Sequence, residues 1–148
     1  MPSGWMQGTL VTYLAELSSA TLKIMLLRNS YTYNPDHKFI ADLTPASNEC
    51  NVSGYVGGFG GAGRRTLASK TITEDTTNNR ATFDAADPST WTALAAGNTL
   101  RFAAIVEEVS TDANSRVVAV LDFGSDFLTN GGDFSVAFNP AGIGYINC

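Results

Sequence analysis

One histidine and several scattered carboxylates are the side chains in this sequence that could perform acid–base chemistry. His37 is the only histidine, and a histidine-based hydrolase would also need a nucleophile and an orienting carboxylate. No G-x-S-x-G nucleophile elbow occurs. A glycosidase would need two carboxyl groups about 5 to 9 Å apart. The candidate acids fall at expected strand ends and turns, where carboxylates are usually solvated: Glu107, Glu108, Asp122, Asp126 and Asp133. We therefore predict no catalytic residues and no enzymatic activity.

A glycine-rich motif is the next candidate for chemistry. Residues Gly58–Gly63 read GFGGAG, which matches the G-x-G-x-x-G pattern of dinucleotide-binding sites. Such a site needs a helix directly after the last glycine, because the helix N-terminus holds the pyrophosphate. The residues that follow soon after, TLASKTIT, are instead rich in β-branched types that favour strands. We therefore predict no cofactor, and we interpret residues 57–63 as a flexible glycine-rich loop or arm.

The two cysteines, Cys50 and Cys148, allow two interpretations. A disulfide between them would close a very long loop and contribute about 4 to 5 kcal/mol in the chain-entropy model. Alternatively both are free thiols, and Cys148 could reach a neighbouring subunit. Two isolated cysteines and one histidine do not make a four-ligand zinc set, so we predict no metal site.

Composition limits the partners that the protein could have. The chain has 148 residues, of which only 16% are charged, and its formal net charge is -5. Nucleic-acid binding relies on clustered Lys and Arg, and the only basic pair is Arg64-Arg65, so we predict no nucleic-acid partner. No secretory signal is visible, and the aliphatic runs are far shorter than the ~20 residues that a spanning helix needs. We predict no membrane partner.

Strand patterns dominate the chain. Thr21–Arg28 contains four consecutive apolar residues and is expected to be a central strand. Leu100–Val109 and Arg116–Phe123 are also expected inside a sheet, separated by a loop of turn formers. A strand at Phe134–Phe138 should follow the turn at Asn130-Gly131-Gly132. Further strands are expected at Cys50–Val56, Arg65–Thr73 and Arg80–Ala85, the last two as a hairpin.

Helical patterns are short and few. Apolar spacing predicts an amphipathic helix over Trp5–Leu17, within an N-terminal segment or arm of residues 1–20. Proline after a capping residue predicts a two-turn helix from Pro35 that ends before Pro45, and a single helical turn near Asp87 that packs Trp91 onto the core. The sequence thus predicts one mainly β domain over residues 1–148, an antiparallel sandwich or barrel with two or three short helices.

Aromatic and basic residues in expected loops are candidates for a partner surface, because aromatic side chains and arginine are enriched at interfaces. The candidate interface residues are Trp5, Tyr31, Tyr33, Tyr55, Phe59, Arg64 and Arg65. The alternative for the aromatic residues is packing over the ends of the sheet.

Four separated stretches together resemble a family of small tailed-bacteriophage virion proteins. They share with it an apolar strand and tyrosine before a His-Lys-Phe segment, a hairpin ending near Ala-Asp, two long strands, and an Asn-Gly-Gly-Asp turn. The stretches are Thr21–Leu43, Arg64–Leu94, Leu100–Phe123 and Thr129–Ile146. The glycine-rich segment 57–63 and the two cysteines depart from the pattern.

The resemblance implies a structural protein of the virion, assembled in the host cytoplasm. A capsid decoration or cement protein would contact the major capsid protein or other virion proteins in many copies, as a homo-oligomer, through residues 1–17 and 57–63. We expect deletion of residues 57–63 to preserve the fold and to weaken attachment. Two alternatives are a tail, fibre or adaptor component, and a carbohydrate-binding module in which tyrosines and Trp5 or Trp91 stack on sugars.

Overall fold

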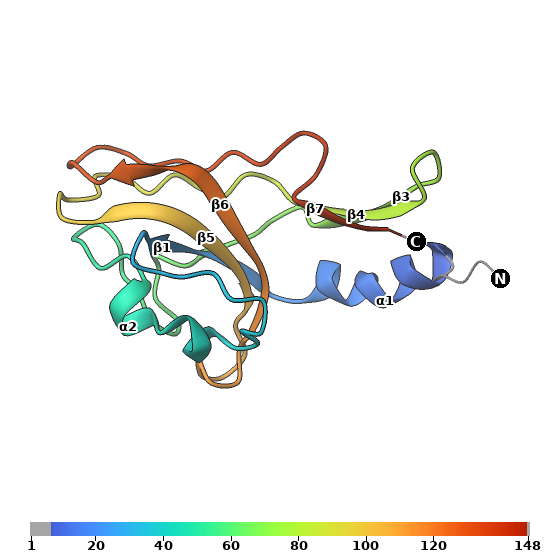
Figure 1. The fold of residues 1–148 in the computed structure, drawn as a ribbon, viewed down its shortest axis with the longest axis horizontal. Helices are drawn as coiled ribbons and strands as arrows, with labels where there is room; N and C mark the ends of the chain where they lie inside the picture. Colours follow the sequence, from blue (N-terminus) through green and yellow to red (C-terminus); the bar gives the residue numbers. More distant parts are fainter. Residues whose placement is uncertain (1–6, 148) are drawn as a thin grey trace. The chain divides into compact units, whose positions relative to one another are not determined.

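The computed structural model describes residues 7–147, and in this range the short helices lie in the first third of the chain and most of the strands follow them (Figure 1). The mainly β, antiparallel class predicted from the sequence is confirmed. The contacts divide the chain into two compact units rather than one. The larger unit contains residues 21–66 and 88–136, and the smaller contains residues up to 20, 67–87 and from 137 onward. Because each unit combines distant segments, no linear boundary marks either of them in the sequence.

The larger unit is built on a four-stranded antiparallel sheet in the order β2-β1-β5-β6. The strands are β1 (Leu22–Arg28), β2 (Arg65–Thr66), β5 (Thr99–Glu107) and β6 (Arg116–Leu128). The predictions for β1 and β5 are confirmed, including their internal positions. The position predicted for β6 is wrong, because this strand forms an edge of the sheet. Only its beginning is covered, where Val117 donates to the Lys38 carbonyl at 2.8 Å.

Both faces of the internal strands are buried, which explains the uninterrupted apolar run in β1. On one face Met25 and Leu27 pack with Tyr31, Ile40 and Leu43, and Ala104 and Val106 of β5 complete this cluster. Side chains alternate along a strand, so the opposite face presents the next set of residues. These are Ile24, Leu26, Ala103 and Ile105, all without solvent exposure. The larger unit therefore has core on both sides of its sheet.

Two short helical turns follow β1, and only the first of them lies within the range predicted to be helical. The helix expected from Pro35 is absent, and a 3-10 helix, η1, spans Ile40–Leu43. The Asp42 carboxylate accepts the Lys38 and Phe39 amides at 2.9 Å, so this acid fixes the start of the turn. Pro45, expected to end a helix, instead occupies the first turn of α2 (Pro45–Asn48). A proline suits that position because its missing N–H has no partner there.

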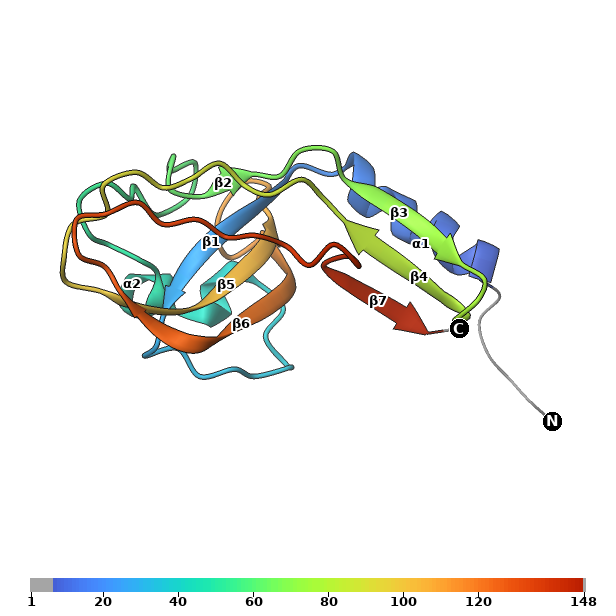
Figure 2. The same cartoon turned by 90° about the horizontal axis from the view of Figure 1, so that it is seen from above.

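The smaller unit has a three-stranded antiparallel sheet in the order β3-β4-β7, and α1 runs along β3 and β4 (Figure 2). The elements are α1 (Gln7–Ser19), β3 (Thr71–Asp75), β4 (Arg80–Asp84) and β7 (Gly144–Asn147). The predicted hairpin is confirmed as β3 and β4, with Ala81 and Phe83 buried. Its first strand begins at Thr71 and not at Arg65, because residues 65–66 form β2 in the other sheet. The helix predicted over Trp5–Leu17 is confirmed as α1 in its described part, and Trp5 lies outside the described residues.

Three other predicted elements are wrong. Residues 50–56 form turns, and only Glu49 makes a single bridge, to Leu27. Residues 134–138 are not a strand, because Phe134 exchanges backbone hydrogen bonds only with Trp91, at 2.8 and 2.9 Å. No helical turn follows Asp87, whose carboxylate accepts the Phe138 amide at 2.7 Å. The predicted burial of Trp91 is nevertheless confirmed.

Candidate functional site

A buried arginine, Arg64, organises the most densely charged part of the larger unit. Its guanidinium has no solvent exposure and faces three carboxylates. It binds Glu49 in a bidentate manner, with distances of 2.9 Å from Nε to Oε1 and 2.8 Å from Nη2 to Oε2. We call the set Lys23, Glu49, Arg64, Glu108 and Asp112 the ionic cluster.

The remaining guanidinium donors are also used. Arg64 Nη1 donates to Glu108 at 3.0 Å and to Asp112 at 2.7 Å, and Nη2 donates to Asp112 at 3.1 Å. Burial alone would lower the pKa of Arg64, but the hydrogen bonds to Glu49 and Asp112 outweigh it and raise that pKa above its ordinary value. Arg64 therefore remains charged, and its charge is neutralised inside the protein.

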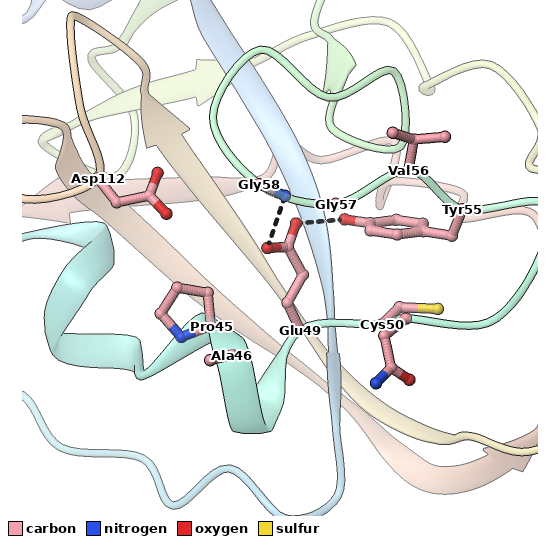
Figure 3. A pocket seen from close by; sticks show the side chains of 10 residues that line it. Pro45, Ala46, Glu49, Cys50, Tyr55, Val56, Gly57, Gly58 and Asp112 are labelled. Carbon is pink, nitrogen blue, oxygen red and sulfur yellow. Dashed lines mark hydrogen bonds between the residues drawn. The ribbon is translucent and has the colours of Figure 1, made fainter.

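Glu49 connects the cluster to the loop that follows α2. Its Oε1 accepts the Tyr55 hydroxyl at 3.0 Å, and its Oε2 accepts the Gly58 amide at 3.2 Å (Figure 3). The Tyr55 hydroxyl in turn accepts the Leu26 amide of β1 at 3.2 Å. Burial, together with the neighbouring Glu49 charge, raises the pKa of Tyr55 well above its ordinary value, so it acts as a neutral donor.

Glu108, directly after β5, holds the other side of the same loop. It accepts the Gly60 amide at 3.1 Å and forms an ion pair with Lys23 of β1. Burial alone would raise the pKa of Glu108. The hydrogen bonds from Lys23, the Gly60 amide and Arg64 outweigh this effect and lower its pKa. The carboxylate form of Glu108 is thus the one that the fold stabilises.

The glycine-rich loop at residues 57–63, predicted to be a flexible loop or arm, is held along its backbone by hydrogen bonds. In addition to the two carboxylate contacts, the Gly63 amide donates to the Val56 carbonyl at 2.9 Å. The Gly63 carbonyl accepts the Trp91 indole at 2.6 Å. At Gly61 a Cβ would lie 2.3 Å from the Val56 carbonyl oxygen, so this position requires glycine. Deletion of the loop should therefore destabilise the unit, contrary to the expectation from sequence.

Two apolar side chains project from this fixed loop. Val56 is 63% exposed and Phe59 is 47% exposed, although the backbone around them is held by the ionic cluster. We call these two residues the loop tip. An open pocket of about 590 Å³ lies beside the loop, with Glu49, Tyr55 and Asp112 in its lining (Figure 3). Both carboxylates in that lining are already paired with Arg64, so the pocket offers no free charge.

The structure separates the predicted interface residues into two groups. Tyr33 and Phe59 are exposed, as an interface requires. Tyr31, Tyr55 and Arg64 are buried and bonded internally, so their assignment to a partner surface is wrong. Arg65 is half-buried, with its guanidinium 5.8 Å from the centre of the Trp91 ring. Trp5 lies outside the described residues.

The remaining candidates for chemistry are held apart or paired. His37 Nδ1 lies 3.0 Å from the Tyr31 hydroxyl, with which it shares a hydrogen bond. Of the scattered acids, Glu107 binds Arg116, and Asp122 binds Arg101. Asp133 accepts the Ala93 amide at 2.9 Å. These acids thus have structural partners.

Cysteine, metal and membrane features can be assigned only within residues 7–147. Cys50 carries a free, buried thiol, and its possible partner Cys148 lies outside the described residues. Burial raises the pKa of the Cys50 thiol. In the described part of the chain no group of three or more His, Cys, Asp or Glu side chains is arranged to hold a metal ion. No helix in that part combines the length and apolar character needed to span a membrane.

Sequence reasoning did not identify the ionic cluster. Its members are spread from β1 to the loop after β5, and only the fold brings them together. In the sequence Arg64 belongs to the basic pair and to the candidate interface residues, and neither feature indicates a buried ion pair. The available signal was the position of Arg64 after the glycines and of Glu108 after the apolar run of β5. A charged side chain that does become buried is almost always paired with an opposite charge.

Comparisons with protein-family models, with curated proteins and with solved structures find no match to this chain. The resemblance to phage virion proteins therefore stays a prediction.

Proposed function

We propose that this protein is a structural component of a bacteriophage virion, attached in many copies to the capsid shell as a decoration or cement protein. The order of features across Thr21–Ile146 supports the family. The observation that carries the attachment role is the loop tip, an exposed apolar pair on a backbone fixed by buried ion pairs. A surface ordered before binding loses less conformational entropy on association.

A small contact can suffice for attachment to a shell, because many copies bind to the same lattice. Val56 and Phe59 offer a limited apolar area, so one copy would bind weakly. Contacts between neighbouring copies on a repeating lattice add to each attachment, in the manner of multivalent binding. The low charge of the chain, 16% of residues, favours extensive coverage by partners of this kind. We therefore assign the contact with the shell to the loop tip. The ionic cluster has the role of holding the loop in place.

A binding assay on particles that lack the protein tests this role. Phe59→Ser should reduce the amount of purified protein that cosediments with particles, while its unfolding midpoint stays within error of the original. Phe127→Ser is the matched control, because Phe127 is similarly exposed, at 45%. Phe127 pairs with Leu100 near the start of β5, whereas Glu108 follows the other end of that strand. Equal binding by the original protein and Phe59→Ser would contradict the assignment.

A tail, fibre or adaptor location is the competing virion role. The loop tip would serve it equally well, so the number of copies per particle separates the two. The carbohydrate-binding alternative loses one of its proposed platforms, because Trp91 is fully buried and cannot stack on a sugar. Tyr33 remains exposed, and a glycan array with Tyr33→Ala would test what is left of that alternative.

A further inference from the structure

The edge strands of the two sheets differ in how they are protected. An exposed edge offers unpaired N–H and C=O groups, and proteins usually blunt it with charges, bulges or very short strands. The edge strand β2 has only two residues. The edge strand β3 carries Glu74 and Asp75. The edge strand β6 carries Asp122 and Asp126, and its register with β5 is interrupted. The fourth edge, β7, is four residues long, but it carries no charged residue and its register with β4 is not interrupted.

The β7 strand is uncharged and solvent-exposed along its whole length. All four of its residues, Gly144–Asn147, are exposed, with Tyr145 at 58% and Ile146 at 47%. Residues 137–148 contain no charged side chain at all. One side of β7 pairs with β4, and no strand within residues 7–147 pairs with the other side. The strand is therefore an open edge with apolar side chains on it.

We propose that β7 pairs with β7 of a second copy of this chain, antiparallel, so that the two three-stranded sheets become one continuous sheet. A second copy is the occupant that the charges favour. Each chain has a net charge of -5, so copies repel unless they meet through an uncharged segment. Pairing through β3 would instead bring the acids Glu74 and Asp75 of both copies together. A two-fold axis at β7 brings together only glycine, tyrosine, isoleucine and asparagine.

The side chains of β7 also suit pairing with a second copy. In the two-fold pairing of all four residues Tyr145 lies opposite Ile146 of the other copy, and cross-strand pairs of an aromatic and a β-branched residue stabilise sheets. Arg80, whose guanidinium is 4.6 Å from the centre of the Tyr145 ring, holds that ring on the strand surface.

Sedimentation velocity of the purified full chain over a wide concentration range tests the pairing without any virus particle. The original protein should show a concentration-dependent dimer. Tyr145→Glu adds a like charge to both edges and places a carboxylate opposite Ile146 of the other copy, so it should raise the dimer dissociation constant about tenfold or more. Tyr33→Glu is the matched control, since Tyr33 is also 58% exposed but lies in the larger unit, and it should dimerise like the original.

A second variant of β7 distinguishes loss of pairing from a folding defect in Tyr145→Glu. Asn147→Lys removes no ring and adds one exposed charge to each edge, so it should also weaken the dimer. Hydrogen exchange of the β7 amides should slow as the concentration of the original protein rises, because pairing protects them. A monomer at every concentration, or dimers of Tyr145→Glu and Asn147→Lys as tight as the original, would overturn the proposal. Neither outcome depends on attachment to a shell, so the proposed function is tested separately.

Discussion

Replacing Arg64 by methionine would remove the one cation that faces all three buried or half-buried carboxylates of the ionic cluster. Methionine keeps much of the aliphatic length of the side chain, so the change mainly removes charge and hydrogen bonds. Glu49 and Glu108 have side-chain exposures of 5% and 4%, and neither can regain full hydration without local opening. Glu108 keeps Lys23, whereas Glu49 keeps only the Tyr55 hydroxyl and the Gly58 amide.

The expected cost follows from this loss. Removing one partner of a buried ion pair typically destabilises a protein by about 3 to 5 kcal/mol, because the other charge is left uncompensated. The free energy of unfolding of a protein is about 5 to 15 kcal/mol in total, so this loss would be a large fraction of it. At an exposed ion pair the same substitution costs at most about 1 kcal/mol. Arg116→Met is such a control, because Arg116 is 66% exposed and binds Glu107.

Urea unfolding at neutral pH measures both variants. With a slope of about 1 to 3 kcal/mol per molar urea, Arg64→Met should lower the midpoint by roughly 1 M or more. Hydrogen exchange of the Gly58 and Gly60 amides should accelerate in Arg64→Met and not in Arg116→Met. The double variant Arg64→Met with Glu49→Met should cost less than the two single costs added, because they share one interaction. Equal midpoints for Arg64→Met and Arg116→Met would refute the reasoning.

Three further predictions concern the same region. The pKa of Glu108 is lowered in the folded state, so its contribution to stability is present above its unfolded pKa of about 4.3 and is lost as the pH falls through the lower folded value. Acid titration of the unfolding midpoint should therefore be shallower in Glu108→Gln. Gly61→Ala should cost about 1 to 3 kcal/mol by crowding the Val56 carbonyl, whereas Gly144→Ala, with open space around it, should change the midpoint little. Trp91→Phe leaves the Gly63 carbonyl without its indole donor and should cost about 1 to 3 kcal/mol in thermal or urea unfolding.

Local sequence patterns predicted the elements whose stability comes from their own residues. The apolar run of β1 predicted an internal strand correctly, since burial on both faces demands such a run. The β3–β4 hairpin followed from two strand-like segments around a cluster of turn formers, and Asn79 adopts a positive φ there. The turn at Asn130 also forms, with its side chain accepting the Gly132 amide at 3.0 Å.

Local sequence patterns gave wrong predictions where contacts between distant segments determine the structure. Phe134–Phe138 alternates like a strand, but it lacks a neighbouring strand and is held by a single bridge to Trp91. The helix expected at Pro35 gave way to η1, because Asp42 organises a later turn. The ionic cluster required five charged residues from distant segments, and nothing in their spacing reveals that they meet. The glycine-rich loop looked flexible because the sequence does not show the carboxylates that hold it.

Counting the copies of this protein in purified particles tests the central claim most directly. Quantitative mass spectrometry of particles, with the major capsid protein as the internal standard, gives the ratio of the two chains. A shell protein attached through the loop tip should be present in a fixed ratio to the capsid protein, with a number of copies per particle comparable to that of the capsid protein. A few copies per particle, or none, would contradict its assignment to the capsid surface.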